Sequence, residues 1–168
     1  ADTAPMTALA DAGLLDGAPE IFARNQLVIV TKPGNPEEIG SLADLADVGV
    51  VSLCVDTAPC GRFADRILTE AGVSVPVGNV TRGTDVRSTL TAVSEGDAVA
   101  AIVYVTDAAA AGDAVDTVEI PSEQNLIADY PIAVVAGSED TELARAFMAY
   151  VLSDEGQAVL ADAGFLSP

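Results

Sequence analysis

The sequence predicts an α/β fold built around a doubly wound sheet, and two observations support this. Apolar, β-branched runs typical of buried strands alternate along the chain with amphipathic stretches typical of helices. Several of the helical stretches are followed by glycine, which commonly ends a helix. Such alternation favours parallel strands with helices on both faces of the sheet. With 168 residues, half of them apolar, the chain can form one domain or two small lobes.

The first part of the chain is expected to contain two helices and two strands. Residues 5–15 predict a short helix, and residues 26–31, Gln-Leu-Val-Ile-Val-Thr, predict a strand. The segment 32–36, Lys-Pro-Gly-Asn-Pro, is rich in turn residues and is the candidate hinge or crossing between lobes. A short helix beginning at Ser41 and a strand at 48–55 follow.

One helix and the strand after it carry the most functional information. Residues 84–95 predict an amphipathic helix in which Thr84 is the N-cap and Asp85 lies at the positive end of the helix dipole. The apolar run 98–105 predicts a strand covered on both faces, with Tyr104 at its carboxyl end. The helix start and the phenol both suit an anion. Spacing alone nevertheless favours the alternative that Tyr104 is a core tyrosine at a strand end.

The other elements are assigned from the same signals of periodicity, capping and turn residues. They are a helix opening at 60–61 after a loop at 56–59, an Ala-rich turn at 108–111, strands at 115–120 and 127–135, and helices at 141–152 and 154–163, the last capped by Ser153.

Composition and charge exclude several functions. Seven basic and 26 acidic residues give a net charge of −19, so nucleic acid is not an expected partner, because phosphate binding needs clustered Lys and Arg. The same charge repels free anions at distances up to the screening length of about 8 Å, so an anion site must rely on short-range amides and hydroxyls. No apolar run reaches the length of about 18 residues that suggests a membrane span. The opening residues do not resemble a signal peptide and are expected to belong to a mature or trimmed chain.

The chain lacks the residues that chemistry on a substrate usually needs. It has no histidine, and its two cysteines, Cys54 and Cys60, therefore have no imidazole to activate them or to complete a zinc site. The glycine-rich nucleotide motifs are absent as well. We therefore expect no enzyme, no cofactor and no metal site. The two cysteines form either a disulfide, which suits an extracytoplasmic protein, or two buried free thiols.

Two places satisfy the rule that ligands of doubly wound sheets bind at the carboxyl ends of strands, over helix starts. The first is the segment 59–61, Pro-Cys-Gly, after the strand at 48–55. The second is the helix start at 84–86, beside the strand end at Tyr104.

At these residues the chain resembles the periplasmic molybdate-binding proteins of ABC importers. The combination of Pro-Cys-Gly, Asp-Val-Arg and Ile-Val-Tyr is fairly specific to that family, whereas the C-terminal tail is generic to solute-binding proteins. The matching stretches follow the family's order over essentially the whole chain and comprise Ala1 and Asp2 with Met6, 25–30, 59–64, 84–87, Gly96, 102–108, 130–135, 152–157 and 164–165.

The resemblance implies an oxyanion site made of neutral donors. By their positions in the matching motifs, the backbone N–H of Cys60, the backbone N–H of Val86 and the phenol of Tyr104 would hold molybdate or tungstate. Family members often carry Ala where this chain has Cys60, a change that donation by a backbone N–H should tolerate. The expected supporting residues are Pro59, Gly61 and Asp85.

The resemblance also implies the type II periplasmic-binding-protein fold, in which two doubly wound lobes are joined by a two-segment hinge. Residues 1–30 and 131–168 would belong to the first lobe and residues 31–130 to the second, with hinge motion around 29–33 and 129–133. The family's first lobe opens with a strand and a helix that supply two serine-type donors. This sequence lacks them, so the first lobe is expected to be incomplete, either in a fragment or with the missing segment as a separate or proteolysed piece.

The expected function is extracytoplasmic capture of molybdate or tungstate between the two lobes and delivery to an ABC permease in the membrane. A monomer is expected, with lipid anchoring upstream as an option. The alternatives are a receptor for another small oxyanion such as sulfate or phosphate, an enzyme on the same fold, and the anion-sensing effector domain of a transcription regulator.

Overall fold

A computed structural model describes residues 3–168, so the matching residues Ala1 and Asp2 lie outside the described part of the chain. Contacts divide the chain into two units. Unit 1 comprises the residues up to Asn25 and from Ile127 onward, and unit 2 comprises Gln26–Leu126. Both crossings fall a few residues before the predicted lobe boundaries, and the turn-rich segment 32–36 lies inside unit 2. None of the helices in residues 3–168 has the length and apolarity needed to cross a membrane.

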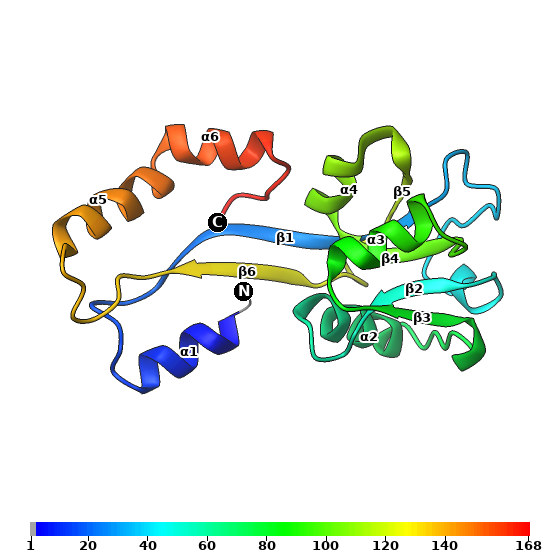
Figure 1. Cartoon of the computed structure of the whole chain (residues 1–168), viewed down its shortest axis with the longest axis horizontal. Helices are drawn as coiled ribbons and strands as arrows, with labels where there is room; N and C mark the ends of the chain where they lie inside the picture. The colour runs from blue at the N-terminus through cyan, green and yellow to red at the C-terminus, as the bar shows by residue number, and fades with distance from the viewer. Residues whose placement is uncertain (1–2) are drawn as a thin grey trace. The chain divides into compact units, whose positions relative to one another are not determined.

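A mixed sheet with the strand order β3-β2-β4-β1-β5 forms the frame of unit 2 (Figure 1). Strand β2 runs parallel to both β3 and β4, whereas β1 is antiparallel to β4 and β5. The three parallel neighbours β3, β2 and β4 therefore end at one edge of the sheet. The strands are β1 (Glu20–Thr31, whose first residues belong to unit 1), β2 (Val51–Cys54), β3 (Val80–Gly83), β4 (Ala100–Tyr104) and β5 (Asp116–Glu119).

Helices cover both faces of this sheet, because its central strands are apolar on both sides. In β1, Leu27 and Ile29 join a buried cluster with α2, while Val28 and Val30 join a second cluster with α3 and α4. Figure 1 shows α2 on one side of the sheet and α3 and α4 on the other. This arrangement explains why the strands read as continuous apolar runs. The helices are α2 (Pro59–Glu70), α3 (Val86–Ser94) and α4 (Val105–Ala111).

Short 3₁₀ turns and side-chain bonds hold the loops of unit 2. The Asn35 side chain donates to the carbonyl of Ile39 and accepts from its N–H, at 2.8 and 3.1 Å. The Lys32 Nζ donates to the carbonyl of Gly96, just beyond α3, at 2.9 Å. The 3₁₀ turns are η1 (Ala43–Ala46), η2 (Val77–Asn79) and η3 (Gly112–Ala114).

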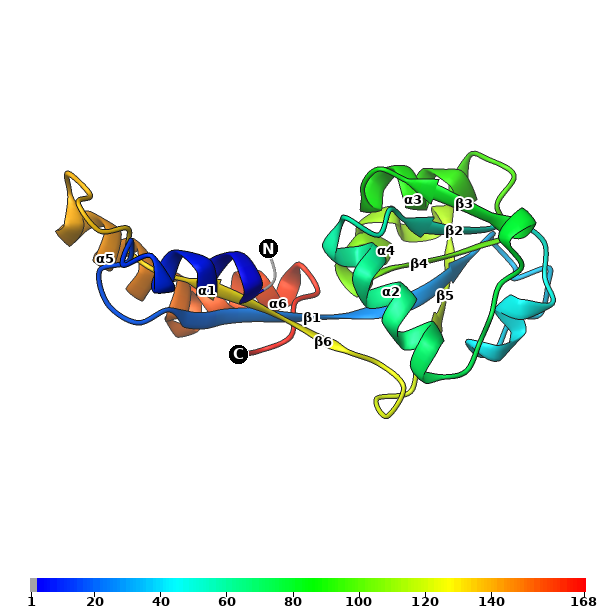
Figure 2. The ribbon, with the colours of Figure 1, turned by 90° about the horizontal axis from the view of Figure 1, so that it is seen from below.

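Unit 1 contains the first part of β1, which pairs with β6, and three helices. Helix α5 has the predicted bounds, and the Ser153 Oγ caps α6 by accepting the Gly156 N–H at 3.2 Å, as expected. Figure 2 shows α5 and α6 following one another along the chain. Helix α1 packs against β6. The bounds are α1 (Thr3–Asp11), β6 (Ile127–Ile132), α5 (Thr141–Leu152) and α6 (Asp154–Asp162).

The predicted Ala-rich turn at 108–111 is wrong, because these residues belong to helix α4. Alanine has the highest intrinsic helix propensity. A carboxylate in the first helical turn, here Asp107, adds a favourable interaction with the helix dipole. The helix begins directly after Tyr104, with no turn residues between strand and helix.

Candidate functional site

The three residues predicted to hold an oxyanion follow three neighbouring parallel strands. Cys60 is the second residue of α2, after β2, and Val86 is the first residue of α3, after β3. Tyr104 is the last residue of β4. Because β3, β2 and β4 are adjacent and parallel, their carboxyl ends share one edge of the sheet. The structure thus brings all three residues to the same edge of unit 2.

The start of α2 is shaped by Pro59 and Gly61. Ala58 is the N-cap, and Pro59 follows as the first helical residue, where its fixed φ suits a helix and its missing N–H costs nothing. A Cβ at position 61 would overlap the Val55 carbonyl and lie 2.8 Å from the Cys54 carbonyl oxygen, so only glycine lets the helix come this close to the strand end. The two cysteines are bridged: Cys60 forms a disulfide with Cys54.

The start of α3 is capped by Asp85, so the prediction of Thr84 as N-cap is wrong. The Asp85 carboxylate accepts the Ser88 N–H at 2.7 Å, and the Ser88 Oγ accepts the Asp85 N–H at 3.2 Å, forming a capping box. Hydrogen bonds from the Ser88 N–H and hydroxyl hold the pKa of Asp85 below its usual value. The first residue of the helix is consequently Val86, whose N–H cannot have an acceptor four residues back within the helix.

Gly83 allows α3 to approach the end of β3 closely, as Gly61 allows α2 to approach the end of β2. A Cβ at position 83 would lie 2.6 Å from the Thr89 nitrogen and 2.8 Å from the Ser88 Oγ. Glycine therefore lets the first turn of α3 pass back over the end of β3. At each helix start, a glycine therefore allows close contact between the first helical turn and the end of the preceding strand.

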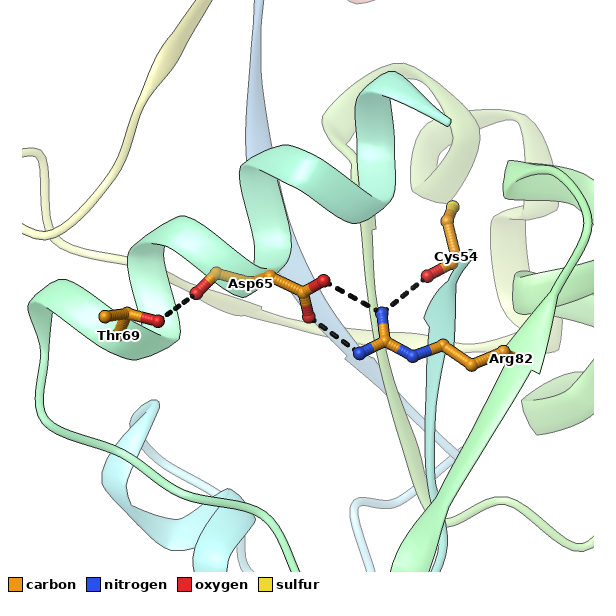
Figure 3. A network of polar contacts seen from close by, with 4 residues as sticks. All are labelled: Cys54, Asp65, Thr69 and Arg82. Carbon is orange, nitrogen blue, oxygen red and sulfur yellow. Dashed lines mark hydrogen bonds and ion pairs between the residues drawn. The ribbon is translucent and has the colours of Figure 1, made fainter. Parts of the chain in front are cut away.

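A polar network joins β3 and the end of β2 to helix α2, and sequence reasoning missed it. Arg82 in β3 donates to the Cys54 carbonyl at 2.7 Å and forms two bonds with the Asp65 carboxylate in α2, at 2.8 and 3.2 Å (Figure 3). The Thr69 hydroxyl in turn donates to the Asp65 carbonyl at 2.7 Å. Arg82 is 28 residues from Cys54 and 17 from Asp65, so no local pattern could have revealed these two contacts.

Tyr104 joins the site from the partly buried end of β4. Its ring packs against the cluster on the α2 face, which agrees with the core interpretation, whereas donation by its hydroxyl stays a prediction. The Asp107 carboxylate lies close by. Burial raises its pKa, whereas the N–H groups of Asp107 and Tyr104 and the charge of Arg87 act in the opposite direction. Sequence reasoning missed Asp107, although an acid at the third position of a helix is a known capping signal.

Within residues 3–168, no three His, Cys, Asp or Glu side chains gather where they could hold a metal ion. A cavity of about 490 Å³ in unit 1 is lined by none of the predicted site residues. Its one cation, Arg145, is paired with Asp16 at 2.8 Å.

Comparisons with known proteins support the resemblance found in the sequence. The molybdate-binding protein ModA of Mycobacterium tuberculosis H37Rv is 40% identical over 170 residues, spanning 100% of this chain and 64% of ModA. The periplasmic molybdate-binding protein of Azotobacter vinelandii is 20% identical with a TM-score of 0.82, over 100% of this chain and 76% of that one. The sulfate-binding protein SubI of M. tuberculosis H37Rv is 22% identical with a TM-score of 0.80, over 97% and 65%. These matches confirm the resemblance seen in the sequence and the predicted fold class.

The chain spans 64% of the length of the curated molybdate-binding relatives that it matches. The sequence profile described as bacterial extracellular solute-binding protein matches residues 1–166. Because this match covers nearly the whole chain, the protein belongs to the family of bacterial extracellular solute-binding proteins.

Proposed function

We propose that the chain is part of a receptor that binds molybdate or tungstate outside the cytoplasm and passes it to an ABC importer. The observation that carries this proposal is the placement of Cys60, Val86 and Tyr104 at one edge of three parallel strands. It gains weight from 40% identity to a protein named for molybdate binding.

The proposed donors are neutral, and this suits a fully desolvated dianion. The amides at the starts of α2 and α3 carry the partial positive charge of the helix dipoles, and the Tyr104 hydroxyl adds a third donor. Such groups bind at short range, so the net charge of −19 weakens long-range attraction without blocking the site itself. In this proposal the chain supplies one part of the site, and serine-type donors from a further segment supply the rest.

An extracytoplasmic location is supported by two independent observations. The family is described as extracellular. The Cys54–Cys60 disulfide also belongs to oxidising compartments, since cytoplasmic thiols are kept reduced.

A titration with a matched pair of variants tests the proposal. Molybdate is titrated calorimetrically into the protein carrying the further segment that this proposal invokes. Tyr104→Phe should weaken binding by about 1.5–3 kcal/mol, the range for a hydrogen bond to a charged group. Tyr150→Phe, on the exposed face of α5, removes the same atom away from the site and should bind like wild type. Equal affinity for Tyr104→Phe and wild type would remove Tyr104 from the site.

The second candidate is a sulfate receptor, favoured by the similarity to SubI. Sulfate and molybdate are both tetrahedral dianions, so their charge and shape do not separate them, whereas their size does. Sulfate added as a competitor in the same titration decides between them: if sulfate displaces molybdate at equal concentration, the sulfate function is preferred.

A further inference from the structure

Cys54, the last residue of β2, joins three elements around the proposed site. It is fully buried, and its sulfur is bonded to Cys60 in the first turn of α2. The same sulfur accepts a hydrogen bond from the Thr89 hydroxyl of α3 at 3.4 Å. Its carbonyl accepts the Arg82 guanidinium of β3 at 2.7 Å. One strand end is thus connected to both helices whose first amides are proposed to hold the anion.

Helix α2 is attached at two successive turns. The disulfide holds its first turn, and the Arg82 guanidinium holds Asp65 in its second turn (Figure 3). The Arg82 and Asp65 side chains are about one third exposed, so this ion pair is a weaker constraint than the covalent bridge. Two attachments on neighbouring turns restrict how far the helix can slide or tilt.

Helix α3 is attached to the same strand end. The buried Thr89 hydroxyl shares its one proton between the Asp85 carbonyl, at 2.8 Å, and the Cys54 sulfur, at 3.4 Å. Gly83 brings the first turn of the helix onto the end of β3. The amides of Cys60 and Val86 are consequently held by chains of contacts that meet at Cys54.

The bridge is not needed for donation itself, because the N–H of residue 60 donates whatever its side chain is. It also closes a short loop, between residues six apart, and short loops give a disulfide little leverage on global stability. Its main effect is therefore expected on local geometry, which is where the proposed donor lies.

We propose that the Cys54–Cys60 disulfide determines specificity by fixing the spacing between the Cys60 and Val86 amides. The inference rests on the proposed function. Molybdate has longer bonds to oxygen than sulfate, so donors held at a fixed spacing can fit one anion and fail to reach the other. Donors that are free to approach one another would close around the smaller anion and lose this discrimination.

The test compares the affinities for molybdate and sulfate in wild type and in the double variant Cys54→Ala/Cys60→Ala, both with the further segment present. Molybdate binding should weaken about tenfold, as when one hydrogen bond to a charged group is strained, and the preference for molybdate over sulfate should fall by a similar factor. Ile67→Val is the matched control: it lowers stability from within the core of α2 and should leave the preference unchanged.

A second measurement keeps the wild-type sequence, in case the double variant does not fold. Dithiothreitol supplies two electrons and two protons, which convert the bridge into two thiols while the reagent becomes its cyclic disulfide. Thiol counting verifies the reduction, and the anions are titrated after the reagent is removed without oxygen. An unchanged preference in the folded reduced protein or in the double variant overturns the inference. Failure of the oxidised wild type to bind molybdate overturns the proposed function instead.

Discussion

Unit 2 encloses a core of its own, whereas unit 1 leaves most of its large apolar side chains half-buried and several of them exposed. In unit 2, Ile29, Ile67 and Ile102 are completely buried. In unit 1, helices α1 and α5 bury none of their residues, and Phe147 is 60% exposed. The candidate site lies within unit 2, where Cys54, Cys60 and Thr89 behind it are buried. The comparison separates the part of the chain that positions donors from the part that does not.

The largest expected effect tests this contrast directly. Ile67→Ala should lower the free energy of unfolding by about 3 kcal/mol, because it removes buried atoms and leaves a cavity. Phe147→Ala removes a larger side chain but should cost below about 1 kcal/mol, since most of the ring is already in water. Denaturant unfolding of both variants gives the two values. Similar losses would contradict the difference in burial between the units.

A smaller effect is expected where helix starts meet strand ends. Gly61→Ala should destabilise the protein by about 2 kcal/mol, because its Cβ would collide with the Val55 carbonyl and force the helix away. Gly78→Ala is the control: no atom lies within 4 Å of its Cβ, so it should be neutral or stabilise by about 0.5 kcal/mol. Thermal unfolding measures both. A harmless Gly61→Ala would mean that the contact between α2 and β2 is looser than described.

The smallest expected effect is on the pH dependence of stability, which tests the surroundings of Asp107 at the same edge of the sheet. Burial raises the pKa of Asp107 above its ordinary value of 3.8, against the N–H of Tyr104 and the charge of Arg87. The folded state then binds more protons than the unfolded state between the ordinary and the raised pKa. Stability from this group is present below pH 3.8 and is lost as pH rises through the raised pKa. The stability of Asp107→Asn relative to wild type should therefore increase as pH rises from 3.8 through the raised pKa.

Asp85 serves as the comparison, because its pKa is shifted in the opposite direction. Its pKa is lowered by the Ser88 hydrogen bonds, so its contribution is present above pH 3.8 and is lost as pH falls through the lowered pKa. The stability of Asp85→Asn relative to wild type should therefore decrease as pH rises from the lowered pKa to 3.8. Unfolding curves recorded at a series of pH values yield both differences. Identical slopes for the two variants would contradict the assigned environments.

The fold was predictable where a signal is local. Helix α5 and the cap Ser153 were found because apolar periodicity and capping depend on neighbouring residues. The start of α3 was misplaced by one residue, because the choice between Thr84 and Asp85 depends on how Gly83 brings the helix onto β3. Strand β1 begins at Glu20, well before the predicted start, since its first part mixes polar and apolar residues.

Sequence reasoning located the candidate site but not the contacts that support it. The rule about strand ends and helix starts pointed to segments 59–61 and 84–86 beside Tyr104. The resemblance then implied Cys60, Val86 and Tyr104 as donors, a role that stays a prediction. The state of the cysteines stayed open, because it depends on a Cα–Cα distance of 5.8 Å that only the folded chain defines. The Arg82–Asp65 pair likewise follows from strand pairing and not from spacing.

Lys32 is a residue at which a fluorescent label could report the proposed anion binding. It is the single lysine among the 168 residues, and its amine lies against the Gly96 carbonyl, just beyond α3. An amine-reactive fluorophore would therefore modify one side chain of this sequence and give a uniform optical signal. At 1.5 Å of rise per residue, the attachment point lies roughly 13 Å along α3 from Val86. A dye there would report on the helix whose first amide is proposed to hold the anion, without occupying the site.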